Sequence, residues 1–171
     1  DLLGTGSPDP DTPGVFGVPN NRATAIADNG TVAAGWASDT ATVEGLGAYG
    51  VEVRRGVEDQ KAFDLGIINE TTARGLFVLL NALARGAAVS KSASARMVEV
   101  LAAQEFNAGI PKGVPPGTRV AHKTGTITRV HHDAGIVYGS RPCVLVVLTR
   151  GIEKESDSDA LIARITRALL P

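Results

Sequence analysis

Apolar residues recur every three or four positions in three segments of the chain, residues 71–86, 90–104 and 156–170. This spacing gathers the apolar side chains on one face of a helix and leaves the charged residues on the opposite face. The sequence therefore predicts three amphipathic helices, whose apolar faces are formed by Leu76, Leu79, Leu80 and Leu83 in the first, Met97, Val100 and Leu101 in the second, and Leu161, Ile162, Ile165 and Leu169 in the third.

Residues with the chemistry of helix caps stand at the ends of these segments. Thr71 or Thr72 can accept hydrogen bonds from the first free amides of the first helix, and Ser90 or Ser92 can do so for the second. Gly86 can adopt the left-handed conformation that commonly ends a helix.

Three short apolar runs, residues 119–125, 134–139 and 143–149, lie between the second and third predicted helices. Runs of this length bounded by turn residues are typical of β-strands. The last two runs are separated by the turn sequence Gly-Ser-Arg-Pro and are therefore expected to pair antiparallel. Helices packed on such a sheet give an α+β fold, an α/β sandwich with an antiparallel sheet.

The first part of the chain carries fewer signals. Residues 1–21 are rich in proline, glycine and aspartate and are expected to form a flexible arm, which leaves residues 22–171 as a single domain. Two apolar runs within residues 23–36 flank an Asn-Gly pair and suggest a hairpin. Residues 38–70 lack a long periodic segment, so we expect irregular structure with a short helix near Glu58–Phe63.

Charge and composition exclude several classes of function. The 171 residues carry 17 basic and 18 acidic side chains and a net charge of -1, with no basic stripe of the kind that binds nucleic acid. No apolar run approaches the roughly 20 residues that a membrane helix needs. The single cysteine, Cys143, cannot form an internal disulfide and is expected to be a small buried residue of its strand.

The strongest chemical signal is the sequence Lys-Thr-Gly at the end of the first predicted strand. Lys123 supplies a cation and Thr124 a hydroxyl, while Gly125 lacks a side chain and lets another backbone come close. The N–H of Thr126 can point at a developing oxyanion. These groups suit an acyl substrate that carries a carboxylate.

This motif and its surroundings resemble the serine β-lactamase and penicillin-binding-protein superfamily. The similarity to the C-terminal half of the class A β-lactamases extends over residues 54–171, including an omega-loop-like segment that contains Glu58. The resemblance implies that Lys123 and Thr124 bind the substrate carboxylate and that the Thr126 amide donates to the oxyanion. Glu58 is either the acid that activates the deacylating water or a solvated loop carboxylate. It also implies a β-lactam or peptidoglycan-like substrate, no cofactor, and a periplasmic or secreted protein.

Two motifs of that superfamily do not match. The nucleophile stands in Ser-x-x-Lys, but none of the five lysines has a serine three positions before it; Glu58, Ala88, Gly109, Val120 and Gly151 occupy those positions. Ser38 and Asp39 match the first two residues of Ser-Asp-Asn, but Thr40 replaces the asparagine.

Three explanations remain for the missing nucleophile. The sequence can be an incomplete record of a longer enzyme, which is the preferred explanation. It can be a degenerate relative that binds peptidoglycan-type peptides or β-lactams without turnover. A second chain can also supply the serine. Separately, a homodimer is left open.

His131, His132 and Asp133 follow the motif and raise the question of a metal site. Neighbouring residues of a strand point to opposite faces, so the two histidines cannot easily share one ion. No metal is therefore expected, and His132 and Asp133 are expected to support the Lys-Thr-Gly strand through hydrogen bonds. His122 is expected to face away from Lys123.

Overall fold

The computed structural model describes residues 43–56 and 59–170. The chain divides into two compact units, residues 1–75 and residues 76–171. The arm and the hairpin predicted within residues 1–36, and the candidate site residues Ser38 and Glu58, lie outside the described residues.

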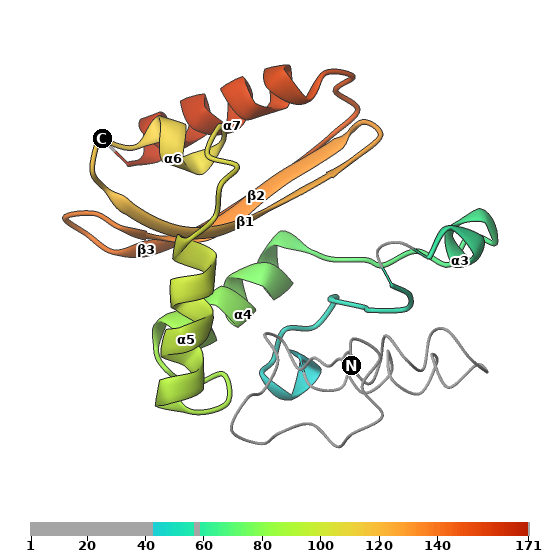
Figure 1. The fold of residues 1–171 in the computed structure, drawn as a ribbon, viewed down its shortest axis with the longest axis horizontal. Coiled ribbons are helices and arrows are strands. Elements are labelled where there is room, and N and C mark those ends of the chain that lie inside the picture. Colours follow the sequence, from blue (N-terminus) through green and yellow to red (C-terminus); the bar gives the residue numbers. More distant parts are fainter. Residues whose placement is uncertain (1–42, 57–58, 171) are drawn as a thin grey trace. The chain divides into compact units, whose positions relative to one another are not determined.

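A three-stranded antiparallel sheet forms the centre of the second unit (Figure 1). Its strands are β1 (Arg119–Ile127), β2 (Val130–Tyr138) and β3 (Cys143–Arg150), in the order β1-β2-β3. The antiparallel pairing of β2 and β3 across the Gly-Ser-Arg-Pro turn confirms the prediction from the sequence.

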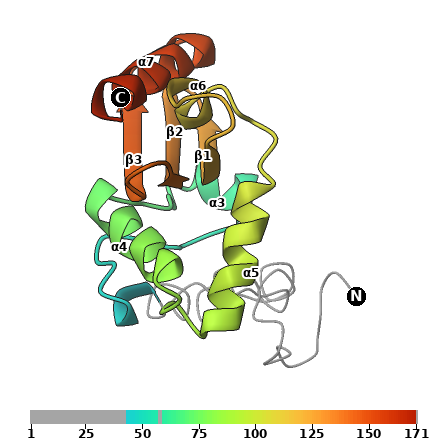
Figure 2. The same cartoon turned by 90° about the vertical axis from the view of Figure 1, so that its left-hand side faces the viewer.

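Helices cover both faces of this sheet (Figure 2). On one face, α4 (Ala73–Ala84) and α5 (Lys91–Ala102) enclose a core with β1 and β2 whose buried members include Leu83, Met97, Ala121 and Ile136. On the other face, α6 (Ile110–Gly113) and α7 (Glu155–Leu169) enclose a core formed by Ile110, Val120, Val137, Val147 and Ile162. Because the two apolar faces of the sheet are both covered, the predicted α+β sandwich is confirmed.

The caps of the helices agree with the predicted chemistry. The Ser90 hydroxyl accepts a hydrogen bond from the Ala93 amide at 3.1 Å, and the Thr72 hydroxyl accepts one from the Gly75 amide at 3.0 Å. Gly86 has a φ of +70°, and the amides of Gly86 and Ala87 donate back to Leu83 and Ala82. This is the Schellman motif, which the glycine makes possible because it has no Cβ.

Two elements differ from the prediction. Strand β2 begins at Val130 rather than at residue 134, because Thr128 and Arg129 form a tight turn in which Arg129 has a φ of 60° and Val130 pairs with Ile127. The prediction missed this part of the strand because the sequence His-His-Asp is polar. The short helix α6 also occupies a stretch that reads as a loop; Pro111 lies in its first turn, where a missing N–H is tolerated.

In the first unit, hydrogen bonds join residues 52–55 to residues 69–70 and form the neck of a loop. The backbones of Glu52 and Glu70 exchange two hydrogen bonds of 2.9 and 3.0 Å. Inside this neck the Asn69 side chain accepts from the amides of Arg54 and Arg55 at 2.8 and 2.9 Å and donates to the Arg55 carbonyl at 2.9 Å. The loop carries the short helix α3 (Gln60–Asp64), which has no buried residues.

Replacing Asn69 is expected to open this loop without unfolding the helices and sheet of residues 76–170. Asn69→Ala removes three hydrogen bonds, and the free energy of local opening should fall by about 1–3 kcal/mol. Limited proteolysis should then cleave the loop faster. Asn69→Asp keeps the acceptor oxygens, so its loop should be cleaved at a rate between those of the wild type and of Asn69→Ala. Cleavage of Asn69→Ala at the wild-type rate would contradict this role.

No helix within the described residues has the length and apolar character required to cross a bilayer.

Candidate active site

Strand β1 changes character halfway along its length. Val120, Ala121 and His122 are buried, whereas the residues from Lys123 to Ile127 are exposed apart from the half-buried Thr124. Within the described sheet β1 is an edge strand, paired only with β2. An edge strand keeps unpaired backbone N–H and C=O groups along its free side, and these can hydrogen-bond a bound ligand.

Lys123 lies at the point where the buried half of β1 ends. Its cross-strand partner is Ala134, which belongs to the core on the α4 and α5 face, so the Lys123 side chain leaves the sheet on that face. The ammonium donates to the backbone carbonyl of Thr124 at 2.5 Å. None of the carboxylates in the described part of the chain lies within ion-pair distance of it. The cation therefore remains available for an anionic ligand.

Gly125 and Thr126 continue the exposed half of the strand. A Cβ built on Gly125 would have no atom within 4 Å, so the space beside this residue is open. The Thr126 hydroxyl donates to the Glu155 carboxylate at 2.9 Å, which ties the end of β1 to the start of α7. The exposed half of β1 is thus held in place while its Gly125 position stays free of side chains.

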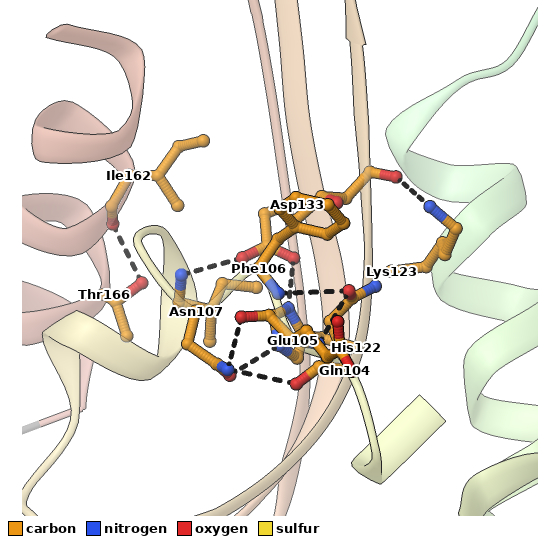
Figure 3. Close-up of polar contacts among 11 residues, drawn as sticks. Gln104, Glu105, Phe106, Asn107, His122, Lys123, Asp133, Ile162 and Thr166 are labelled. Atoms are coloured by element: carbon orange, nitrogen blue, oxygen red, sulfur yellow. Dashed lines mark hydrogen bonds and ion pairs between the residues drawn. The ribbon is translucent and has the colours of Figure 1, made fainter. Parts of the chain in front are cut away.

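A buried polar cluster lies behind Lys123, on the α6 and α7 face of the sheet (Figure 3). His122 and Asp133 are each 1% exposed, and Nδ1 of His122 lies 2.8 Å from Oδ1 of Asp133. The other carboxylate oxygen of Asp133 accepts from the Ile110 amide at 2.8 Å. Nε2 of His122 lies 3.3 Å from Oδ1 of Asn107. Figure 3 shows Lys123 extending away from this cluster, so His122 and Lys123 leave β1 on opposite sides.

The two adjacent histidines of β2 do not share a site. Nδ1 of His132 accepts from the Thr149 amide of β3 at 3.1 Å, while the His132 backbone lies opposite Gly125 of β1. His131 is 5% exposed and neither ring nitrogen has a hydrogen-bond partner among the described residues. In residues 43–56 and 59–170 no group of three or more histidine, cysteine, aspartate or glutamate side chains is arranged to hold a metal ion.

Electrostatic effects reach two further titratable groups. Burial, with the nearby Glu155 and Asp133 carboxylates, raises the pKa of Asp159, and His131 lowers it. Burial also raises the pKa of the Cys143 thiol. Since the thiolate is the reactive form of cysteine, Cys143 is a poor replacement for a missing serine nucleophile.

Lys123, Thr124, Gly125 and Thr126 thus follow one another along the outer half of β1, with Lys123 and Gly125 on one face of the strand and Thr124 and Thr126 on the other. Sequence reasoning missed Asn107 and the Ile110 amide, which join His122 and Asp133 only after the chain has folded. The sequence Gly109-Ile110-Pro111 was the available signal, because proline is favoured in the first turn of a helix.

The fold and the edge motif define a class. An antiparallel sheet between helices, with Lys-Thr-Gly on an edge strand, is the arrangement expected for the serine β-lactamases and penicillin-binding proteins. The chain belongs to the β-lactamase enzyme family, whose sequence profile matches residues 31–171.

Solved structures share this fold. PBP-A is 23% identical with a TM-score of 0.69, and the match covers 78% of this chain and 49% of PBP-A. A β-lactamase from Sphaerobacter thermophilus is 23% identical with a TM-score of 0.69, covering 81% of this chain and 54% of that one. A β-lactamase from Chitinophaga pinensis is 24% identical with a TM-score of 0.69, covering 78% and 54%.

The chain spans about half the length of these structures, which agrees with the predicted partial match to the fold of the family. No functionally curated protein matches the chain.

Proposed function

We propose that this chain carries the carboxylate-binding part of a serine β-lactamase-like hydrolase that opens a β-lactam or a related amide or ester. The observation that supports this role is the exposed edge of β1, where a cation, a hydroxyl and open space beside a glycine follow one another. Lys123 and Thr124 bind the substrate carboxylate, the substrate lies along the strand beside Gly125, and the Thr126 amide donates to the oxyanion. Membership of the β-lactamase enzyme family gives the reaction class.

The reaction that we propose proceeds through an acyl-enzyme. A serine oxygen attacks the carbonyl carbon, the C–N bond breaks and the released nitrogen takes up a proton; water then cleaves the acyl ester. The 171 residues contain no Ser-x-x-Lys, so this serine stands outside that motif or comes from a segment or a chain other than these 171 residues. Ser38 is our candidate for the second motif and Glu58 for the group that activates water.

The missing Ser-x-x-Lys also favours a second candidate function. In this alternative the chain is a non-catalytic relative that binds β-lactams or peptidoglycan-type peptides through the same strand edge. Both functions place the protein in the periplasm or outside the cell, where such substrates occur, and neither uses a cofactor.

Titration with benzylpenicillin and with its methyl ester tests the proposed site. The acid is expected to shift the backbone amide resonances of Lys123–Thr126, and the ester, which has no charged carboxylate, should bind about 10-fold or more weakly. Nuclear magnetic resonance on the full chain gives both the location of the bound ligand and its affinity. Equal affinities for acid and ester, or shifts confined to other elements, would refute carboxylate binding at β1.

A further inference from the structure

We propose that His122 and Asp133 are positioning residues of the carboxylate site, holding β1 from its buried face while Lys123 and the free edge of the strand engage the ligand. The inference rests on the proposed function for the identity of the ligand. It rests on the geometry of the buried cluster for the two residues themselves.

The two residues flank the binding groups directly. His122 precedes Lys123 in β1, and Asp133 is the cross-strand partner of Thr124 in β2. Both side chains are 1% exposed, so neither can touch a ligand bound at the strand edge. Any influence on the ligand must therefore pass through the backbone of β1.

Hydrogen bonds fix the His122 ring from both sides. The Asn107 amide nitrogen donates to the carbonyls of Gln104 and Glu105, each at 3.0 Å, so its oxygen faces Nε2 of His122. Nδ1 faces the Asp133 carboxylate. Each of the two ring nitrogens therefore has a hydrogen-bonding neighbour.

The cluster joins three segments that are distant in sequence. Through Asp133 it reaches the first residue of α6, through Asn107 it reaches the loop after α5, and through His122 it reaches β1. In Figure 3 these groups surround the ring on the side away from Lys123. The backbone on either side of His122 therefore has little freedom, which lowers the entropy that a ligand must remove on binding.

Two glycines make room for this arrangement. A Cβ on Gly109 would lie 2.5 Å from Oδ2 of Asp133, and a Cβ on Gly135 would lie 2.5 Å from Cβ of His122. Both separations are shorter than van der Waals contact. The chain therefore approaches the two side chains closely from both directions, and the cluster is tightly confined.

The test compares His122→Gln with Thr166→Val in the full chain. Glutamine cannot bridge Asp133 and Asn107 as the rigid ring does, so the affinity for benzylpenicillin is expected to fall about 10-fold. Thr166 is also buried, in α7, where its hydroxyl donates to the Ile162 carbonyl at 2.8 Å, and its variant should bind as the wild type does. In Asp133→Asn the amide oxygen can accept from Ile110 and the amide nitrogen can donate to Nδ1 of His122, so its affinity should stay within about 3-fold of the wild type.

A double-variant cycle separates positioning from a general effect on folding. In a Lys123→Ala background, His122→Gln should have little further effect on affinity, because the group through which it acts is gone. An equal loss in both backgrounds, or wild-type affinity of His122→Gln, would overturn the proposal. If His122→Gln does not fold, the surface variant Asn107→Ala takes its place in the cycle with the same two outcomes.

Amide hydrogen exchange without ligand keeps the test independent of the proposed function. Exchange at the Lys123 and Gly125 amides, which point toward β2 when the Thr126 amide points to the free edge, should be about 10-fold faster in His122→Gln, while exchange in β3 is unchanged. If the wild-type chain binds no penicillin, the proposed function fails, but faster exchange still supports the positioning role. Unchanged exchange at these amides overturns it.

Discussion

Nitrocefin hydrolysis by the 171-residue chain is expected to be about 10⁶-fold slower than hydrolysis by a serine enzyme with an intact nucleophile. In a serine protease of another fold, loss of the nucleophile lowers turnover by this factor. The residual rate is about 10³–10⁴ times that of the uncatalysed reaction in water. The chain has no Ser-x-x-Lys, and burial raises the pKa of its only cysteine thiol. Binding at the strand edge alone cannot replace the covalent step.

Two measurements on the full chain check this expectation. Nitrocefin colour change gives the rate against a buffer blank, and intact-mass analysis after incubation with benzylpenicillin detects an acyl adduct. The expected outcome is residual hydrolysis without an adduct. A stoichiometric adduct would contradict the prediction, and peptide mapping would then locate the nucleophile, with Ser38→Ala as the first variant to examine.

The second large effect is expected for Lys123→Ala. A hydrogen bond between an ammonium and a carboxylate contributes about 1.5–3 kcal/mol, so the affinity for benzylpenicillin should fall by about 10- to 150-fold. The stability of the folded state should be nearly unaffected, because Lys123 is exposed and its hydrogen bond is to the neighbouring Thr124 carbonyl. Titration by nuclear magnetic resonance and a thermal melt of the same sample measure the two quantities.

Lys112→Ala provides the matched control for this variant. Lys112 is exposed on α6, which packs on the opposite face of the sheet, and its removal changes the net charge by the same amount. If both variants lose affinity equally, the effect is one of overall charge. The specific role of Lys123 would be refuted in that case.

Much of the architecture could be predicted from the sequence because its signals are local. Leucines at helical spacing predicted α4, and Gly86 and Ser90 marked helix ends that the structure confirms. The turn at Gly-Ser-Arg-Pro predicted the antiparallel pairing of β2 and β3. Each of these features depends on residues within a few positions of one another.

The candidate site could be predicted only in part. The Lys-Thr-Gly motif marked the exposed half of β1, because its three residues are adjacent in the chain. The start of β2 at Val130 was hidden, since His131 to Asp133 are polar yet two of the three are buried. Burial of polar residues is decided by hydrogen-bond partners from other segments, and these partners cannot be read from a local pattern.

The sequence by itself determined the order of helices and strands, the family resemblance and the groups on the edge of β1. Only the tertiary structure decided that His122 meets Asp133, Asn107 and the Ile110 amide on the buried face. The physical reason is that hydrophobic periodicity is set by the geometry of a single element, whereas a buried polar cluster exists only when packing brings donors and acceptors from separate elements within hydrogen-bond distance.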